Sequence, residues 1–481
     1  MRKTKLIALL QQLSTRERSR FREYVFSPFF NKNKKIQLLA QHLLDQAPEF
    51  PEEKLQKPVV FRLLFGAGKY QELKINNIIS DLLQLLYDYL AHRQYETQKA
   101  MQKNLLLDDL LARGAYDHIE RVARRYQQIQ EKSHHQNYQF FHQQFELYNQ
   151  LDRHHLSKAT RTYDENLQLK NNALDLYYLS NKLRIACDML SRNIVQKAGY
   201  ECHFLDELLI IYEQNNFDFR QYPSVNIYYK ILQMLQSENP ERHYRDLKQL
   251  LDAHHARFPQ EEARIIYVYL QNYCIQKINS GQSEYYKELQ DLFKALLEQG
   301  ILYMNGYLTQ WDYKNIITIG LRLKDFGWTE KVIHQYKQHL LEEERNNAVA
   351  YNLAAFHYEK KEYKKALQEL HNVEFTDTSY HLGTKIIQIK SYYELDESEA
   401  LYALIEAFQK YILRNRDLAE YRKKANAHFL RLTKKIYQLK ISKQHLSTSA
   451  FNKKQRVLRE QLDRLHPLAN KGWLEMIYEK L

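Results

Sequence analysis

The segment YEKKEYKKALQEL, residues 358–370, predicts a helix, a tight turn and a second helix. The charged run Lys360-Lys361-Glu362 separates two stretches whose apolar residues keep helical spacing. Tyr363 follows the turn and is expected to pack back against the first helix. Ala366 lies further along, where a small side chain lets two helices approach closely. The segment therefore predicts the turn of a helical hairpin and the helix contact next to it.

The hairpin pattern recurs with a spacing of 34 residues. Three sets of residues keep this spacing: Val332, Ala366 and Ala400; Gly320, Ala354 and Gln388; and Gly327, Lys361 and Leu395. A fixed period of roughly 20 to 50 residues indicates stacked supersecondary units. We therefore expect consecutive hairpins that pack against one another.

The unit AYNLAAFHYEKKEYKKALQEL, residues 350–370, resembles a tetratricopeptide repeat. Leu353-Ala354 stands at the Leu-Gly pair of that pattern, Tyr363 at its turn aromatic and Ala366 at the alanine of its second helix. The register covers residues 313–414. The resemblance implies an α-solenoid of antiparallel helix hairpins.

The resemblance weakens outside this region, because the spacing drifts there. His357 stands where the pattern has an aromatic residue, and Thr378 where it has a proline. The segment SPFFNK, residues 27–32, resembles one found in uncharacterised bacterial helical proteins, and that resemblance implies no mechanism.

The tetratricopeptide-like resemblance also implies where a partner would bind, because the first helices of such hairpins line a concave face. The groove positions would be Lys324, Tyr351, Tyr358, Lys385 and Tyr392. The chain has 38 tyrosines. Most are expected in the core with the hydroxyl reaching water. Others are expected to line the groove, since tyrosine is enriched where binding energy concentrates.

The composition favours an all-α fold. Among 481 residues only 11 are glycine and 8 are proline, although hydrophobic residues make up 44%. Sheet-rich folds use glycine for positive-φ turns, so its scarcity favours helices joined by short links. The three cysteines, Cys187, Cys202 and Cys274, are odd in number and far apart, which indicates reduced thiols. We find no apolar run of about 18 residues and expect a cytoplasmic protein.

Local signals divide the chain into four regions. We expect a small helical N-terminal region at 1–95 and an irregular hairpin array at 96–312. Tetratricopeptide-like repeats follow at 313–414 and a basic helical cap at 415–481.

Two expectations in the N-terminal part are specific. Ser14 and Glu17 form a capping-box pattern for a helix ending near Phe26. The stretch from Glu72 runs to Gly114 without a helix breaker.

No motif in the chain predicts catalysis, a cofactor or a metal. FGAGKY, residues 65–70, lacks the four residues between glycines and the Ser or Thr that a phosphate loop requires, so it predicts a glycine turn at a helix end. The histidine doublets, such as His134-His135, place neighbouring rings about 100° apart on a helix and cannot share a metal.

Positive charge is concentrated in one segment. Residues 410–460 contain 15 Lys or Arg and 3 Asp or Glu, which leaves +12 of the total +13. In the predicted helix at 417–440, Lys423, Lys424, Lys434 and Lys435 lie off the apolar stripe. They form either the solvated face of a packed helix or a contact surface for RNA, DNA or an acidic protein. Replacing all four is expected to leave the fold intact.

The sequence thus supports two functional hypotheses. The first is a non-catalytic scaffold that presents a helical-repeat groove to a protein or peptide. The alternative is a nucleic-acid-binding protein that uses the basic C-terminal helices. The oligomeric state and the partner cannot be read from the sequence.

Overall fold

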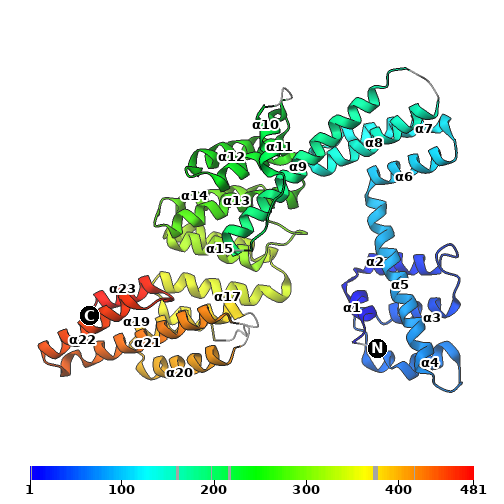
Figure 1. Ribbon diagram of the computed structural model, residues 1–481. Coiled ribbons are helices and arrows are strands. Elements are labelled where there is room, and N and C mark those ends of the chain that lie inside the picture. Colours follow the sequence, from blue (N-terminus) through cyan, green and yellow to red (C-terminus); the bar gives the residue numbers. More distant parts are fainter. Residues whose placement is uncertain (2, 159–161, 197, 215–217, 372–377, 416–417) are drawn as a thin grey trace. The chain divides into compact units, whose positions relative to one another are not determined.

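The computed structural model describes residues 1, 3–158, 162–196, 198–214, 218–371, 378–415 and 418–481. The chain divides into two compact units, Met1–Phe258 and Pro259–Leu481. Figure 1 labels their helices in chain order. Within the described segments the regular structure consists of 23 α-helices and five short 3₁₀ helices, which confirms the all-α expectation. The boundary after Phe258 falls inside the irregular hairpin array expected at 96–312.

Unit 1 contains the first twelve α-helices. They are α1 (Lys5–Gln12), α2 (Thr15–Phe26), α3 (Lys34–Leu44), α4 (Lys57–Phe65), α5 (Glu72–Thr97), α6 (Lys99–Ala112), α7 (Tyr116–Glu131), α8 (Tyr138–Ser157), α9 (Glu165–Gln196), α10 (Leu205–Gln214), α11 (Pro223–Gln236) and α12 (Pro240–His254). Helices α1 to α5 share one apolar core, in which Leu6, Phe21, Leu39 and Leu82 are fully buried.

Local signals set several helix ends in unit 1. The Ser14 hydroxyl accepts a hydrogen bond from the Glu17 N–H at 3.3 Å, and the Glu17 carboxylate accepts one from the Ser14 N–H at 2.7 Å. This confirms the expected capping box and the end of α2 at Phe26. Helix α4 ends at Phe65, and the next residue, Gly66, has a φ of 74°, a positive value that glycine adopts without strain.

Although the stretch from Glu72 to Gly114 contains no helix breaker by residue type, α5 ends at Thr97 and α6 begins at Lys99. At the break, the Thr97 hydroxyl donates to the Gln94 carbonyl at 2.7 Å. The Gln102 side chain donates to the Tyr95 carbonyl, also at 2.7 Å. These side chains bond carbonyls at the end of α5 and compete with a continuing helix, although no residue there is a strong breaker by type.

Unit 2 contains the other eleven α-helices. They are α13 (Gln260–Asn279), α14 (Tyr285–Glu298), α15 (Gln310–Arg322), α16 (Phe326–Tyr336), α17 (Glu342–Glu359), α18 (Tyr363–Glu369), α19 (Thr378–Glu394), α20 (Ser398–Arg414), α21 (Glu420–Ser442), α22 (Thr448–Arg464) and α23 (Lys471–Glu479). None of the helices in the described segments combines the length and apolarity that a transmembrane span requires.

Three hairpins of unit 2 close with the same turn: α15–α16, α17–α18 and α19–α20. In each, one residue has left-handed φ, and the next N–H donates back to a carbonyl five residues earlier, as in a Schellman motif. The left-handed residues are Lys324, Lys361 and Asp396, with φ of 56°, 62° and 59°. The closing N–H···O distances are 3.0 Å for Asp325 to Gly320, 2.8 Å for Glu362 to His357 and 3.1 Å for Glu397 to Tyr392.

The spacing of these turns differs from the 34 residues read from the sequence, since the left-handed residues are 37 and 35 residues apart. Lys361 lies in its turn as expected, whereas Gly327 lies in the first turn of α16 and Leu395 precedes the left-handed residue. The structurally equivalent fourth residues of α16, α18 and α20 are Thr329, Ala366 and Leu401, all fully buried.

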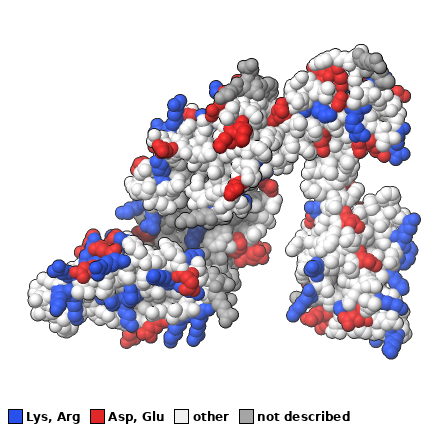
Figure 2. Space-filling model, in the orientation of Figure 1, with Lys and Arg blue, Asp and Glu red and all other residues white. Residues whose placement is uncertain are grey.

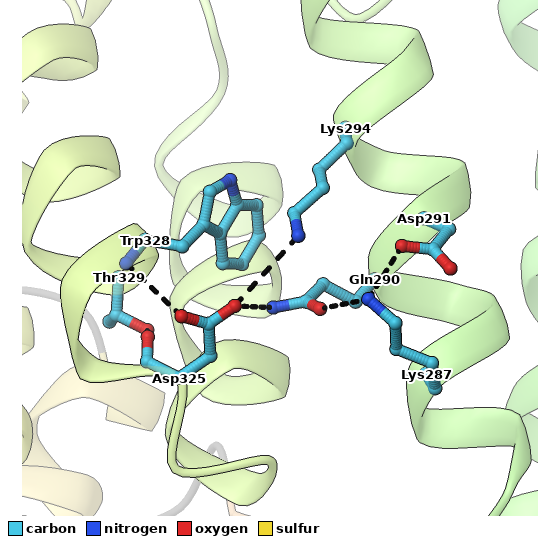
Figure 3. A network of polar contacts seen from close by, with 7 residues as sticks. All are labelled: Lys287, Gln290, Asp291, Lys294, Asp325, Trp328 and Thr329. Carbon is cyan, nitrogen blue, oxygen red and sulfur yellow. Dashed lines mark hydrogen bonds and ion pairs between the residues drawn. The ribbon is translucent and has the colours of Figure 1, made fainter.

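A polar network holds α14 to the turn before α16 (Figure 3). The Asp325 carboxylate accepts from the Trp328 N–H at 3.2 Å and from the Gln290 side chain at 3.0 Å. Lys294 on α14 lies 3.8 Å from the same carboxylate and 5.0 Å from the centroid of the Trp328 ring. Lys287 donates to the Gln290 oxygen at 3.1 Å, so both ends of this buried amide are bonded. The network positions two neighbouring hairpins.

Helices α15 and α16 pack tightly against each other at Gly320. A Cβ there would lie 2.2 Å from the Thr329 hydroxyl and 3.0 Å from two carbons of the Trp328 ring. Gly320→Ala is therefore expected to destabilise unit 2 by roughly 1–2 kcal/mol, despite the better helix propensity of alanine.

Gly327→Ala is the matched control, because nothing lies within 4 Å of its Cβ position. That variant is expected to be neutral or more stable by up to about 1 kcal/mol. Urea unfolding of both variants checks the difference, and equal midpoints would contradict the close approach at Gly320.

Candidate functional site

The expected groove residues lie on two helices and one turn. Tyr351 and Tyr358 lie on α17, about 10 Å apart along its axis. Lys385 and Tyr392 lie on α19. Lys324 lies outside the helices, as the exposed left-handed residue between α15 and α16. The structure brings Tyr351 and Tyr358 into two separate clusters of lysine and aromatic rings.

The first cluster surrounds Lys314 of α15. Its Nζ lies 4.7 Å from the ring centroid of Tyr351, 4.8 Å from that of Tyr380 and 5.9 Å from that of Trp311. A Cβ on Gly383 of α19 would lie 2.7 Å from the Tyr351 hydroxyl, so glycine is required for this packing. Burial raises the pKa of Tyr351 to about 12. Tyr351 thus packs where α15, α17 and α19 meet.

The second cluster surrounds Lys390 of α19. Its Nζ lies 5.9 Å from the ring centroid of Tyr358 on α17 and 5.5 Å from that of Trp473 on α23. The same Nζ donates a hydrogen bond to the Asn470 side-chain oxygen at 2.8 Å. Lys390 therefore joins α17, α19 and the start of α23.

The charge on Lys390 is poorly compensated. The pKa of Lys390 is lowered to about 8, mainly because the group is buried and to a smaller extent because of the positive charge of Arg322. The negative charge of Glu359 opposes this shift. Burial also lowers the pKa of Lys385, which donates to Gln388 at 3.1 Å. Among the described residues no carboxylate lies within 4.0 Å of either ammonium group. A cation held this way gains from a nearby anion.

Sequence reasoning missed the lysines at the centre of both clusters. Lys314 lies 37 residues before Tyr351. This distance equals the spacing between the left-handed turn residues Lys324 and Lys361, whereas the sequence had suggested a spacing of 34 residues. The correct period would have placed it at the groove position equivalent to Tyr351. Nothing in the sequence joins Lys390 to Asn470, which is 80 residues away.

The four lysines expected to contact polyanions lie on α21, but three of them are engaged in contacts. Lys423 pairs with Glu420 at 2.7 Å. Lys434 lies 3.7 Å from a Glu406 oxygen of α20 and 5.6 Å from the ring centroid of Tyr402. Lys435 donates to Gln461 of α22 at 2.8 Å. Lys424 is exposed.

The four lysines therefore do not form one solvated face. Lys434 and Lys435 reach the helices on either side of α21, so replacing all four is now expected to loosen the packing of α20, α21 and α22. Figure 2 shows Lys and Arg side chains spread over α21 and α22, with Asp and Glu among them. Positive charge is abundant on this part of the surface, but these four residues do not define a single contact patch.

The described residues contain no group of three or more His, Cys, Asp or Glu side chains placed to hold a metal ion. A scan against protein-family models and searches of the curated proteins and of the solved structures found no match to this chain. The geometry of the chain itself is therefore the basis for a functional conclusion.

Proposed function

We propose that the protein is a non-catalytic scaffold of tetratricopeptide-like hairpins that binds acidic segments of partner proteins. The binding face is formed by α15, α17 and α19. The observation that carries the proposal is Lys390, whose partly buried ammonium group lies 5.9 Å and 5.5 Å from the ring centroids of Tyr358 and Trp473. Among the described residues, no carboxylate lies within 4.0 Å of this group.

Among the described residues of this face, no carboxylate offsets the positive charge of Lys385 or Lys390 at close range. A partly buried lysine destabilises the folded chain unless an anion offsets the loss of hydration. The ammonium groups of Lys385 and Lys390 each donate a hydrogen bond to one side-chain amide oxygen. Lys390 also makes cation–π contacts with two aromatic rings. An Asp or Glu side chain of a partner would supply a charge-assisted hydrogen bond, and the neighbouring tyrosines would supply rigid contact area.

The recurring left-handed turns support the repeat architecture. Three consecutive hairpins close with the same backbone hydrogen bond and bury the fourth residue of the second helix. Stacked hairpins of this kind place their first helices side by side, which forms an extended binding face. We place the protein in the cytoplasm, where its three separate cysteines would remain reduced.

Direct binding tests the proposal. Fluorescein-labelled peptides of about 12 residues, rich in Asp and Glu with interspersed Phe or Leu, are titrated with the full chain and followed by anisotropy. The Lys314→Gln/Lys390→Gln variant is expected to bind at least tenfold more weakly, because each lost charge-assisted contact is worth about 1.5–3 kcal/mol. Lys331→Gln/Lys364→Gln is the control, since it removes the same charge from exposed positions on α16 and α18.

Affinity should also depend on pH in a defined direction. Because the pKa of Lys390 is about 8, the parent is expected to lose affinity for acidic peptides between pH 7 and pH 9 as the ammonium group deprotonates. Lys390→Gln should show a flatter profile over that range. The proposed face would be contradicted if both double variants bound the peptide equally more weakly than the parent, or if the parent did not bind the peptide at all.

A further inference from the structure

A separate groove lies between α21 and α22, and none of its lining residues belongs to α15, α17 or α19. It encloses about 530 Å³. Its lining residues are Lys435, Gln438, Leu439 and Ser442 on α21, and Ala450, Lys453, Lys454, Val457, Leu458 and Gln461 on α22. The hydrogen bond from Lys435 to Gln461 closes one end, and the short connection between the two helices lies at the other.

The groove has an aliphatic floor and a basic rim. Leu439 and Leu458 are almost fully buried, whereas the Val457 side chain on the same surface is 45% exposed. Lys453 and Lys454 are exposed at the edge. None of the ten lining residues is acidic or aromatic.

We propose that this groove docks an acidic amphipathic helix of a partner protein. The lining stretch of α22, residues 450–461, is about 17 Å long, which corresponds to roughly three helical turns. Apolar side chains at positions i, i+4 and i+7 of such a helix would cover Val457 and Leu458. Carboxylates beside that stripe would face Lys453 and Lys454.

The chemistry of the lining favours this occupant over two others. Nucleic acid would find lysines for its phosphates, but single-strand binding relies on aromatic rings for base stacking, and the floor offers only aliphatic side chains. A second copy of this chain, docked symmetrically, would bring the same lysines toward one another, which like-charge repulsion opposes. An acidic helix satisfies both the floor and the rim.

The experiment uses the full chain and a designed peptide of about 15 residues. The peptide carries Leu on one helical stripe and Glu on both sides of it. A comparison peptide has every Leu replaced by Ser and keeps the charge. Anisotropy is expected to show saturable binding of the first peptide, and binding at least tenfold weaker for the second.

Two variants address the floor and the rim. Val457→Asp places a carboxylate at an already exposed position, so the fold should persist, as thermal melting verifies. It is expected to weaken binding at least tenfold, and Lys453→Glu/Lys454→Glu at least as much. Lys424→Glu/Arg431→Glu changes the same charge at exposed positions of α21 outside the groove and should alter affinity less than threefold.

Four results would overturn the proposal. The first two are that the parent binds neither peptide, or that it binds both peptides equally. The third is that a single-stranded RNA 20-mer binds, is displaced only by salt, and binds Val457→Asp as well as the parent. The fourth is that sedimentation shows a dimer of the parent which Val457→Asp dissociates. Lys314→Gln/Lys390→Gln should leave this binding unchanged. Failure of the groove and failure of the proposed binding face are therefore distinguishable.

Discussion

Replacing Ala366 with phenylalanine is expected to destabilise unit 2 by roughly 3 kcal/mol, because overpacking a tight core forces neighbouring side chains and backbone to shift. Ala366 is fully buried on α18. It shares an apolar cluster with Ala354 of α17 and Ile387 of α19, so three helices meet around its methyl group. Urea unfolding, followed by tryptophan fluorescence, measures the change in midpoint.

Lys364→Phe provides the control for this substitution. Lys364 lies on the same short helix but is exposed, so the added ring meets solvent rather than a neighbouring helix. Its effect is expected to stay within about 0.5 kcal/mol. If both variants unfold at the same urea concentration, Ala366 is not the contact point of the hairpin.

Replacing Lys390 with methionine is expected to stabilise unit 2 by about 2–3 kcal/mol at pH 7. Burial and the Arg322 charge lower the pKa of Lys390 from 10.5 to about 8, so folding penalises the charged form. Methionine has a similar length and no charge to desolvate. The lost hydrogen bond to Asn470 offsets part of the gain.

The pH dependence of that gain has a definite sign. Below pH 8 the ammonium group is charged in both folded and unfolded chains, and the full cost of its burial is present. As the pH rises from about 8 to about 10.5, the folded protein releases the proton more readily than the unfolded chain, so the parent becomes more stable relative to the variant. The difference between Lys390→Met and the parent should therefore approach zero near pH 10.5.

Denaturant unfolding of both proteins at pH 7 and pH 10.5 measures this difference. Both must be compared at each pH, because burial raises the pKa values of tyrosines such as Tyr313 and Tyr393. The unfolded chain therefore loses these tyrosine protons at lower pH than the folded protein does, which lowers the stability of parent and variant alike in the alkaline range. A variant less stable than the parent at pH 7 would show that Lys390 is a structural residue. A lysine retained at a cost in stability is typical of a functional position.

Several local features could be read directly from the sequence. The capping box at Ser14, the glycine end of α4 and the turn at Lys361 each depend on residues within one or two helical turns of one another. The spacing of the hairpins could not be read correctly from the sequence. Its left-handed positions are occupied by Lys324, Lys361 and Asp396 rather than glycine, so no residue type marks them.

The sequence by itself determined the all-α class, because helical periodicity and the scarcity of glycine and proline act locally along the chain. The tetratricopeptide resemblance predicted Tyr351 and Tyr358 as groove positions, and both lie on α17. Only the tertiary structure decided what those rings contact. Lys390 and Asn470 are 80 residues apart, and the low pKa of that lysine arises from its burial and from the charge of Arg322. Rings from α17 and α23 lie beside its ammonium group. Desolvation depends on every element packed around a charge, and no spacing within one helix encodes it.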